Sequence, residues 1–145
     1  MTNTKPARRR PAIHMIDNEA ETLTTLAISA QDRLPEVCEL LLEEIGRAHL
    51  HRAERIPADV VTMMSTVEFT DEASGARRTV ELVYPRDADI SANRISILTQ
   101  VGAGLIGLSE GQSIKWPGRN GTERVFTIDR VSHPAAEPAA PENAF

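Results

Sequence analysis

The sequence lacks several features that mark particular classes of protein. A single cysteine among 145 residues excludes an internal disulfide and fits a reducing compartment. No apolar run approaches 18 residues, which predicts that no segment spans a membrane. The net charge of −5 excludes the global positive field that drives nucleic-acid binding, so we expect no sequence-specific DNA binding. These absences predict a cytoplasmic protein, whose apolar content of 41% allows a modest core.

The two ends of the chain have little to bury. Residues 1–12 carry Lys5, three consecutive arginines from Arg8 to Arg10, and two prolines. They lack an apolar stretch and a cleavage site, so they do not form a secretory signal. We expect a disordered basic arm, with an electrostatic contact to nucleic acid or an acidic partner as the alternative. Residues 134–145 contain three prolines and predict a disordered tail.

Residues 16–56 show a helical periodicity. Two apolar rows with steps of four and three predict two helices joined near Asp32, and Pro35 suits the first turn of the second. Matching rows predict an antiparallel helical hairpin. Asp17 or Asn18 is the expected cap of the first helix, and the charged faces, Glu44 included, are expected to be solvated. The rows are Ile16, Ala20, Leu23, Ala27 and Ala30, then Leu34, Cys38, Leu41, Ile45 and Ala48.

From Val60 the apolar period changes to two, which predicts strands and a domain boundary near residue 57. Val67 and Phe69 alternate with polar residues before a turn that ends at Gly75, and the return strand runs to Tyr84. Further strands are expected around Ile95 and Ile97, around Ile114 and Trp116, and from Phe126 to Val131. An Asn-Gly pair at residues 120–121 predicts a hairpin between the last two strands.

A glycine-rich segment over residues 100–111 lies between these strands. Its short apolar run with four glycines predicts a small helix clasped by an antiparallel sheet. Leu105, Ile106 and Leu108 are expected to bury on a sheet face, and Gly107 and Gly111 to end the turn. The segment has no Lys-Ser/Thr pair after its glycines and opens no long helix, so it does not match a phosphate-binding loop.

No residue pattern indicates an active site. His49 and His51 are expected on a helix, where a spacing of two points them to different faces and disfavours a zinc pair. Cys38 lies in an apolar row and is expected to be a buried small hydrophobe. Ser109 is not in a nucleophile elbow. We therefore expect no catalysis, no cofactor and no metal.

The sequence nevertheless resembles a known family over residues 13–133. The residues that carry the resemblance are Val-Val-Thr-Met-Met-Ser from Val60, Leu-Val-Tyr-Pro from Leu82, Asp-Ala-Asp from Asp87, and Val-Gly-Ala-Gly-Leu-Ile-Gly from Val101. Together they resemble the C-terminal domain of the Gre-type transcription elongation factors. With the Ile-Pro pair at residues 56–57 and Asp59, they are more similar to the regulators of nucleoside diphosphate kinase.

The resemblance implies an α+β fold, with an N-terminal antiparallel helical hairpin followed by an FKBP-like antiparallel sheet wrapped on a short helix. The implied units are a short coiled-coil hairpin over residues 13–56 and a Gre C-terminal-type domain over residues 57–133. It also implies binding to RNA polymerase near the secondary channel. The fold suggests a prolyl isomerase as well, but five aromatic residues are too few to wall such a pocket.

The length of the hairpin separates this chain from the Gre pattern, in which the acidic tip of a long coiled coil helps to position a metal ion. A first helix of about 14 residues reaches only about 20 Å. Asp32 is the acidic residue at the tip, and it is equally a typical turn residue. We expect competition with Gre-type factors without stimulated transcript cleavage.

The resemblance places the polymerase contact in the loop that carries Pro85, Arg86, Asp87 and Asp89, which is otherwise an ordinary solvated loop. Reversing both aspartates is expected to weaken polymerase binding without loss of thermal stability. The alternative function is a protein-interaction regulator of nucleoside diphosphate kinase, acting on its level or its activity. A third possible function is that of a vestigial isomerase or chaperone.

Overall fold

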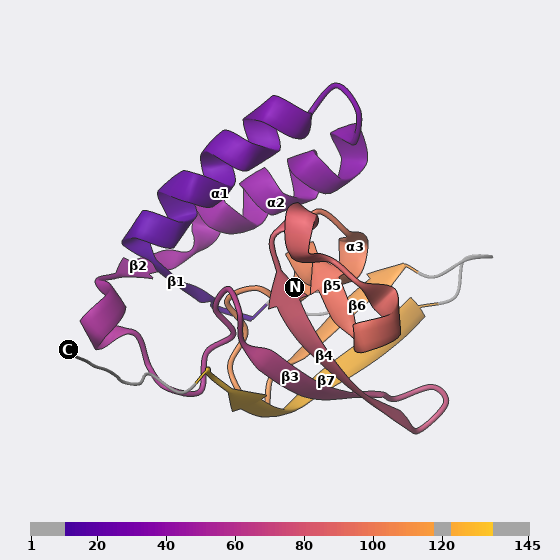
Figure 1. Ribbon diagram of the computed structural model, residues 1–145. Helices are drawn as coiled ribbons and strands as arrows, with labels where there is room; N and C mark the ends of the chain where they lie inside the picture. Colours follow the sequence, from indigo (N-terminus) through magenta and orange to yellow (C-terminus); the bar gives the residue numbers. More distant parts are fainter. Residues whose placement is uncertain (1–10, 118–122, 135–145) are drawn as a thin grey trace, which may run out of the picture.

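A computed structural model describes residues 11–117 and 123–134, in which two helices lie beside a five-stranded sheet that holds a third, short helix (Figure 1). This confirms the prediction of a mixed helix-and-sheet fold. Three predicted features lie wholly or largely outside the described residues: residues 1–10 of the basic arm expected over 1–12, the Asn-Gly turn at residues 120–121, and the tail beyond Pro134. None of the helices in the described ranges combines the length and apolar character needed to cross a membrane.

The first two helices are α1 (Asp17–Ala30) and α2 (Pro35–Arg47), which lie side by side and contact each other (Figure 1). Both predicted apolar rows supply buried residues. Ile16, in extended conformation, is the N-cap of α1, so the expected cap by Asp17 or Asn18 is wrong. Pro35 opens α2, as expected from its fixed φ angle and missing N–H. The buried members of the two rows are Ala20, Leu23, Ala27, Ala30, Cys38 and Leu41.

The prediction of helix through residue 56 is wrong after Arg47. Residues His49–His51 form the short strand β2, which pairs in parallel with β1 (His14–Ile16), and Ala53–Arg55 form a 3-10 turn, η2. The N–H of His49 donates to the carbonyl of Ile13 at 2.9 Å. The helix therefore ends because residues 49–51 form backbone hydrogen bonds with the β1 segment instead of continuing the helical hydrogen bonds.

The larger sheet has the strand order β5-β4-β3-β7-β6. Its strands are β3 (Thr66–Asp71), β4 (Ala76–Val83), β5 (Arg94–Ser96), β6 (Ser113–Pro117) and β7 (Glu123–Ser132). Three of the described pairings are antiparallel, whereas β5 runs parallel to β4 because residues 84–93 cross back over the strand end. The predicted turn after β3 is confirmed, with Gly75 at φ +74°.

The glycine-rich segment forms the helix α3 (Gln100–Leu105), and the predicted small helix is confirmed. The Thr99 side chain caps it by accepting a hydrogen bond from the Gly102 N–H at 3.0 Å. A Cβ atom at Gly102 would lie 2.3 Å from the Ser96 carbonyl oxygen, so glycine permits α3 to lie directly on the end of β5. Gly107 turns the chain at φ +86°. Leu105, Ile106 and Leu108 are buried as predicted.

One hydrophobic core contains residues of both the helices and the sheet. Leu23 and Leu41 of the helices are buried in the same cluster as Phe69 and Ile128 of the sheet. Glu44 of α2 is only 2% exposed, so its expected place on a solvated face is wrong. The Glu44 carboxylate accepts from the Arg47 side chain, which also donates to the carbonyl of Pro11 at 2.7 Å. The hydrogen bond from Arg47 to Pro11 joins the end of α2 to the residues that precede β1.

Candidate partner-binding cleft between helix α1 and the segment after β4

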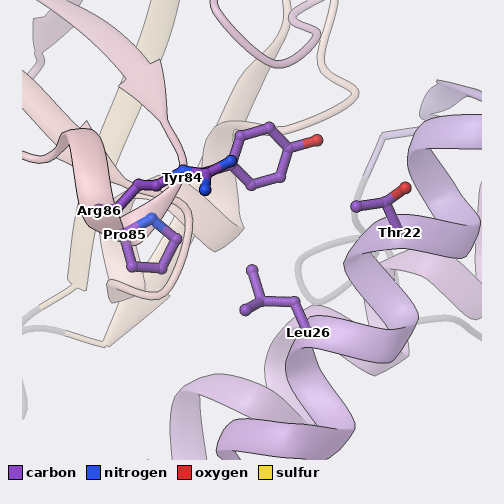
Figure 2. Close-up of a pocket in the computed structure, with 5 residues that line it drawn as sticks. All are labelled: Thr22, Leu26, Tyr84, Pro85 and Arg86. Carbon is purple, nitrogen blue, oxygen red and sulfur yellow. The ribbon is translucent and has the colours of Figure 1, made fainter.

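A cleft of about 500 Å³ separates α1 from the segment that follows β4. Thr22 and Leu26 of α1 line one wall, and Tyr84, Pro85 and Arg86 line the other (Figure 2). Leu26 and the Tyr84 ring project from opposite sides into the space between the walls. The cleft therefore combines apolar lining with two hydroxyl groups and a guanidinium group, a composition typical of sites that bind another molecule.

Local sequence fixes the wall formed by residues 84–86. Pro85 opens the 3-10 turn η3 (Pro85–Asp87), where a fixed φ angle is tolerated, and the Asp87 N–H donates to the Tyr84 carbonyl at 2.9 Å. A second 3-10 turn, η4 (Ile90–Ala92), follows directly. Asn93 then adopts a left-handed conformation with φ 60°, which leads the chain into β5. The two turns hold the wall against the sheet.

Asp89 is the N-cap of η4. Its carboxylate accepts from the Ser91 hydroxyl at 2.7 Å and from the Ser91 N–H at 3.1 Å. The hydroxyl hydrogen bond, with smaller help from backbone N–H groups and Arg94, holds the pKa of Asp89 below its usual value. Because this side chain already supports the loop, reversing its charge removes a cap. We therefore expect charge reversal at Asp89 to lower stability as well as to change the surface, so a test of binding should leave Asp89 in place.

The structure brings four of the five predicted contact residues together. Pro85 and Arg86 line the cleft, while Asp87 and Asp89 lie in the adjoining turns, and all four are exposed. Asp32 is exposed in the turn between α1 and α2. No hydrogen bond or ion pair described within residues 11–117 and 123–134 joins Asp32 to the loop. It therefore stands apart from the cleft.

Sequence reasoning missed the α1 side of the cleft and the role of Tyr84. Leu26 falls outside the apolar row that contains Leu23 and Ala27. A leucine outside the buried row could have indicated an exposed contact surface on α1. Tyr84 was expected to fill the core as a strand residue, yet it is half-buried and lines the cleft. Thr22 lies across the cleft from residues more than 60 positions away in the sequence, and no local sequence pattern predicts that proximity.

Two ionisable groups beside the cleft have shifted pKa values. Burial raises the pKa of Glu19 above its ordinary value, opposed by a hydrogen bond from the Met63 N–H at 3.2 Å. Burial, and then the charge of Glu19, raise the pKa of Tyr84. The Tyr84 phenol is therefore a neutral donor at physiological pH, suited to hydrogen bonding rather than to ionic contact.

The two polar residues of the Val-Val-Thr-Met-Met-Ser motif, Thr62 and Ser65, form a hydrogen-bonded cluster with His133. The Ser65 hydroxyl accepts from the Thr62 N–H at 2.9 Å and lies 3.1 Å from His133 Nδ1. His133 Nε2 lies 2.9 Å from the Ala58 carbonyl oxygen, which makes Nε2 the donor and Nδ1 an acceptor. Ser65 is completely buried, so this pair ties the end of β7 to residues 58–65.

No group of three or more histidine, cysteine or acidic side chains in the described part of the chain is arranged to hold a metal ion. The charged and polar groups at the cleft are the single guanidinium of Arg86, the Thr22 hydroxyl and the Tyr84 phenol. This set suits contact with a protein surface through apolar packing and a few polar interactions.

Comparison with known proteins identifies the relatives of this chain. Residues 56–133 match the family model described as "Transcription elongation factor, GreA/GreB, C-term". The chain is 39% identical over 108 residues to the regulator of nucleoside diphosphate kinase of Escherichia coli strain K12, covering 74% of this chain and 79% of that protein. It is 41% identical over 71 residues to transcription elongation factor GreA of Vibrio cholerae, covering 48% of this chain and 43% of that factor.

A solved structure extends the similarity to the fold. The transcription elongation factor GreA/GreB from Nitrosomonas europaea matches with a TM-score of 0.69 and 38% sequence identity. The alignment covers 86% of this chain and all of that one. The wall formed by residues 84–86 lies inside the region that the family model matches, whereas Thr22 and Leu26 precede it.

Proposed function

The chain belongs to the family that shares the GreA/GreB C-terminal domain, and on this premise we propose that it is a non-catalytic transcription regulator that binds RNA polymerase near the secondary channel. In that position it competes with Gre-type elongation factors and does not itself stimulate transcript cleavage. The observation that carries the proposal is the family match over residues 56–133, which includes the exposed loop and one wall of the cleft.

The proposed contact surface is the cleft together with the turns that follow it. Arg86 and Asp87 are exposed neighbours of opposite charge, which suits a partner surface of mixed charge and fixes the register of docking. Leu26, Pro85 and the Tyr84 ring supply apolar area between them. Aromatic and arginine side chains are enriched among residues that dominate binding energy at protein interfaces. The cleft supplies both kinds.

The dimensions of the helices support regulation without cleavage. Helix α1 has 14 residues, which corresponds to about 20 Å. We assign residues 13–56 as a short antiparallel coiled-coil hairpin and residues 57–133 as an FKBP-like unit. Asp32 lies in the turn at the tip, and the next acidic residue, Glu36, is already inside α2. A short tip with one acidic group is poorly suited to position a metal ion in a distant active centre.

A second candidate function follows from the name of the relative that is 39% identical. That protein is called a regulator of nucleoside diphosphate kinase, so direct binding to the kinase is the alternative, as is an effect on its level. Occupancy of RNA polymerase would place the protein in the cytoplasm and would explain a changed level of the kinase through transcription. Direct binding to the kinase would require no polymerase contact.

Co-purification separates the two functions. The tagged chain is incubated with purified core RNA polymerase and purified nucleoside diphosphate kinase at equal concentrations, and the retained subunits are identified. We expect retention of polymerase, reduced by an excess of a Gre-type factor. Retention of the kinase without polymerase would contradict the proposed function and favour the alternative.

A further inference from the structure

Three of the four histidines of the chain lie together on the small β1–β2 sheet. His14 is the register partner of His49, and Ile16 is the partner of His51. Residues two apart on a strand share a face, so the parallel pairing places the three imidazoles on one side. The ring centroid of His14 is 5.4 Å from that of His49 and 5.0 Å from that of His51. The sequence predicted His49 and His51 on different faces of a helix, whereas on strand β2 they share a face.

A hydrogen bond connects two of these rings. His14 Nδ1 lies 2.9 Å from His51 Nε2. A contact between two imidazole nitrogens requires a proton on one and a lone pair on the other. If both rings are protonated, both nitrogens are donors, and the bond is replaced by repulsion between two cations. The contact is therefore compatible with at most one positive charge on the pair.

The surroundings do little to offset a second positive charge. His49 adds a third imidazole to the cluster, and Asp59 is the acidic group whose charge acts on His14. Arg47, at the neighbouring end of α2, is cationic and is engaged with Glu44 and the Pro11 carbonyl. Asp17, at the start of α1, directly follows β1. Because no three potential ligands in the described ranges are arranged around an ion, the cluster is suited to protons rather than to a metal.

Strand β1 connects the helices to the sheet. The His14 N–H donates to the Gly107 carbonyl at 3.1 Å, and the Ile13 carbonyl accepts from the His49 N–H. A Cβ atom on Gly107 would lie 2.9 Å from the Ile13 Cβ, so the strand rests directly on the glycine-rich segment. Helix α1 begins at the next residue after β1. Release of β1 from β2 would therefore loosen the attachment of α1.

We propose that His14, His49 and His51 form a proton-sensitive clasp, which holds β1 on β2 at neutral pH and opens in acid. In the open state β1 loses its side-chain contact to β2, and the helical pair gains freedom relative to the sheet. The inference concerns the whole-molecule response to pH and is independent of which partner the cleft binds.

The direction of the effect follows from linkage. Burial, and then the charges of His51 and His49, lower the pKa of His14 below 6.5, while Asp59 opposes the shift. The unfolded chain then binds more protons than the folded chain between the lowered folded pKa and 6.5. This contribution to stability is complete above pH 6.5 and is lost as the pH falls through the folded pKa.

The test compares melting temperatures of the full chain at pH 7.5 and pH 5.5. His51→Gln keeps a hydrogen-bond donor toward His14 and removes one proton site, so its melting temperature should fall less in acid than that of the wild type. His133→Gln is the comparison variant outside the cluster: it loses the hydrogen bonds to Ser65 and Ala58 and should have a lower melting temperature at both pH values, but it should keep the additional fall in acid that His51→Gln removes. If His51→Gln does not fold, His49→Gln removes one charge without touching the hydrogen bond.

Ring titrations followed by NMR give a direct readout. We expect His14 to titrate below pH 6.5, and we expect the protection factor of the His49 amide, corrected for the intrinsic pH dependence of exchange, to fall over the same pH range. Equal acid dependence in wild type and His51→Gln would overturn the proposal. A melting temperature raised by zinc at pH 7.5 and restored by chelation, in wild type but not in His51→Gln, would also overturn it in favour of a metal site.

Discussion

Gly102→Ala is expected to lower the free energy of unfolding by about 3 kcal/mol or more. The added methyl group would lie 2.3 Å from the Ser96 carbonyl oxygen and 3.0 Å from the Ile97 Cα. Both neighbours are main-chain atoms at the end of β5, so no side-chain rotation relieves the clash. Helix α3 must then move away from the sheet and uncover Leu105, which is completely buried. Urea denaturation followed by circular dichroism measures the change.

Gly46→Ala is the matched control for this prediction. Gly46 lies in α2, and a Cβ atom there would meet nothing within 4 Å. Alanine has the higher helix propensity, so this variant should be unchanged or more stable by up to about 1 kcal/mol. If Gly102→Ala were as stable as Gly46→Ala, the close packing of α3 against β5 would be contradicted.

Thr22→Arg is expected to weaken binding to RNA polymerase by at least about tenfold, which corresponds to about 1.4 kcal/mol. Thr22 is exposed and lines the cleft, so a long charged side chain there fills the space opposite Tyr84 without entering the core. Thr25→Arg is the control, because Thr25 is an exposed threonine of the same helix that does not line the cleft. Affinity is measured by titration of immobilised core polymerase.

Exchanging charges on the loop tests the other wall. Arg86→Glu combined with Asp87→Arg reverses the local pattern at constant net charge and should weaken the same interaction. Asp89 is left unchanged because its carboxylate caps η4. Glu54→Arg with Arg55→Glu is the matched exchange on η2, where both residues are exposed. If each cleft variant bound polymerase as well as its control, this surface would not be the contact.

Local patterns predicted the elements that rest on local physics. Alternation of Val67 and Phe69 with polar residues predicted β3, since one face of that strand is buried. Gly75 predicted the turn to β4 because it supplies a left-handed conformation. The glycines and apolar residues of residues 100–111 predicted α3 together with its burial. In each case the information lies within about ten residues of the chain.

Features that depend on distant partners were not accessible from these patterns. Strands β1 and β2 are three residues long and more than 30 positions apart. Such short, distant strands leave no alternation to detect, so the sequence predicted His49 and His51 as a continuation of helix α2. Glu44 has the spacing of a solvated face, yet it is buried where Arg47 contacts both its carboxylate and the Pro11 carbonyl. The motifs predicted the loop that now forms one wall of the cleft, but they did not predict the cleft, because Leu26 lies opposite that loop only in the folded chain.

Transcript cleavage on a backtracked RNA polymerase complex tests the central claim most directly. The cleavage rate is measured with the chain alone, with a Gre-type factor alone, and with the factor plus increasing amounts of the chain. We expect the chain alone to leave the intrinsic cleavage rate unchanged. Added to a Gre-type factor, it should lower the stimulated cleavage rate toward the intrinsic rate. The Thr25→Arg variant should compete in the same way, and Thr22→Arg should fail to compete. Stimulation by the chain alone, abolished by Asp32→Ala, would contradict the account.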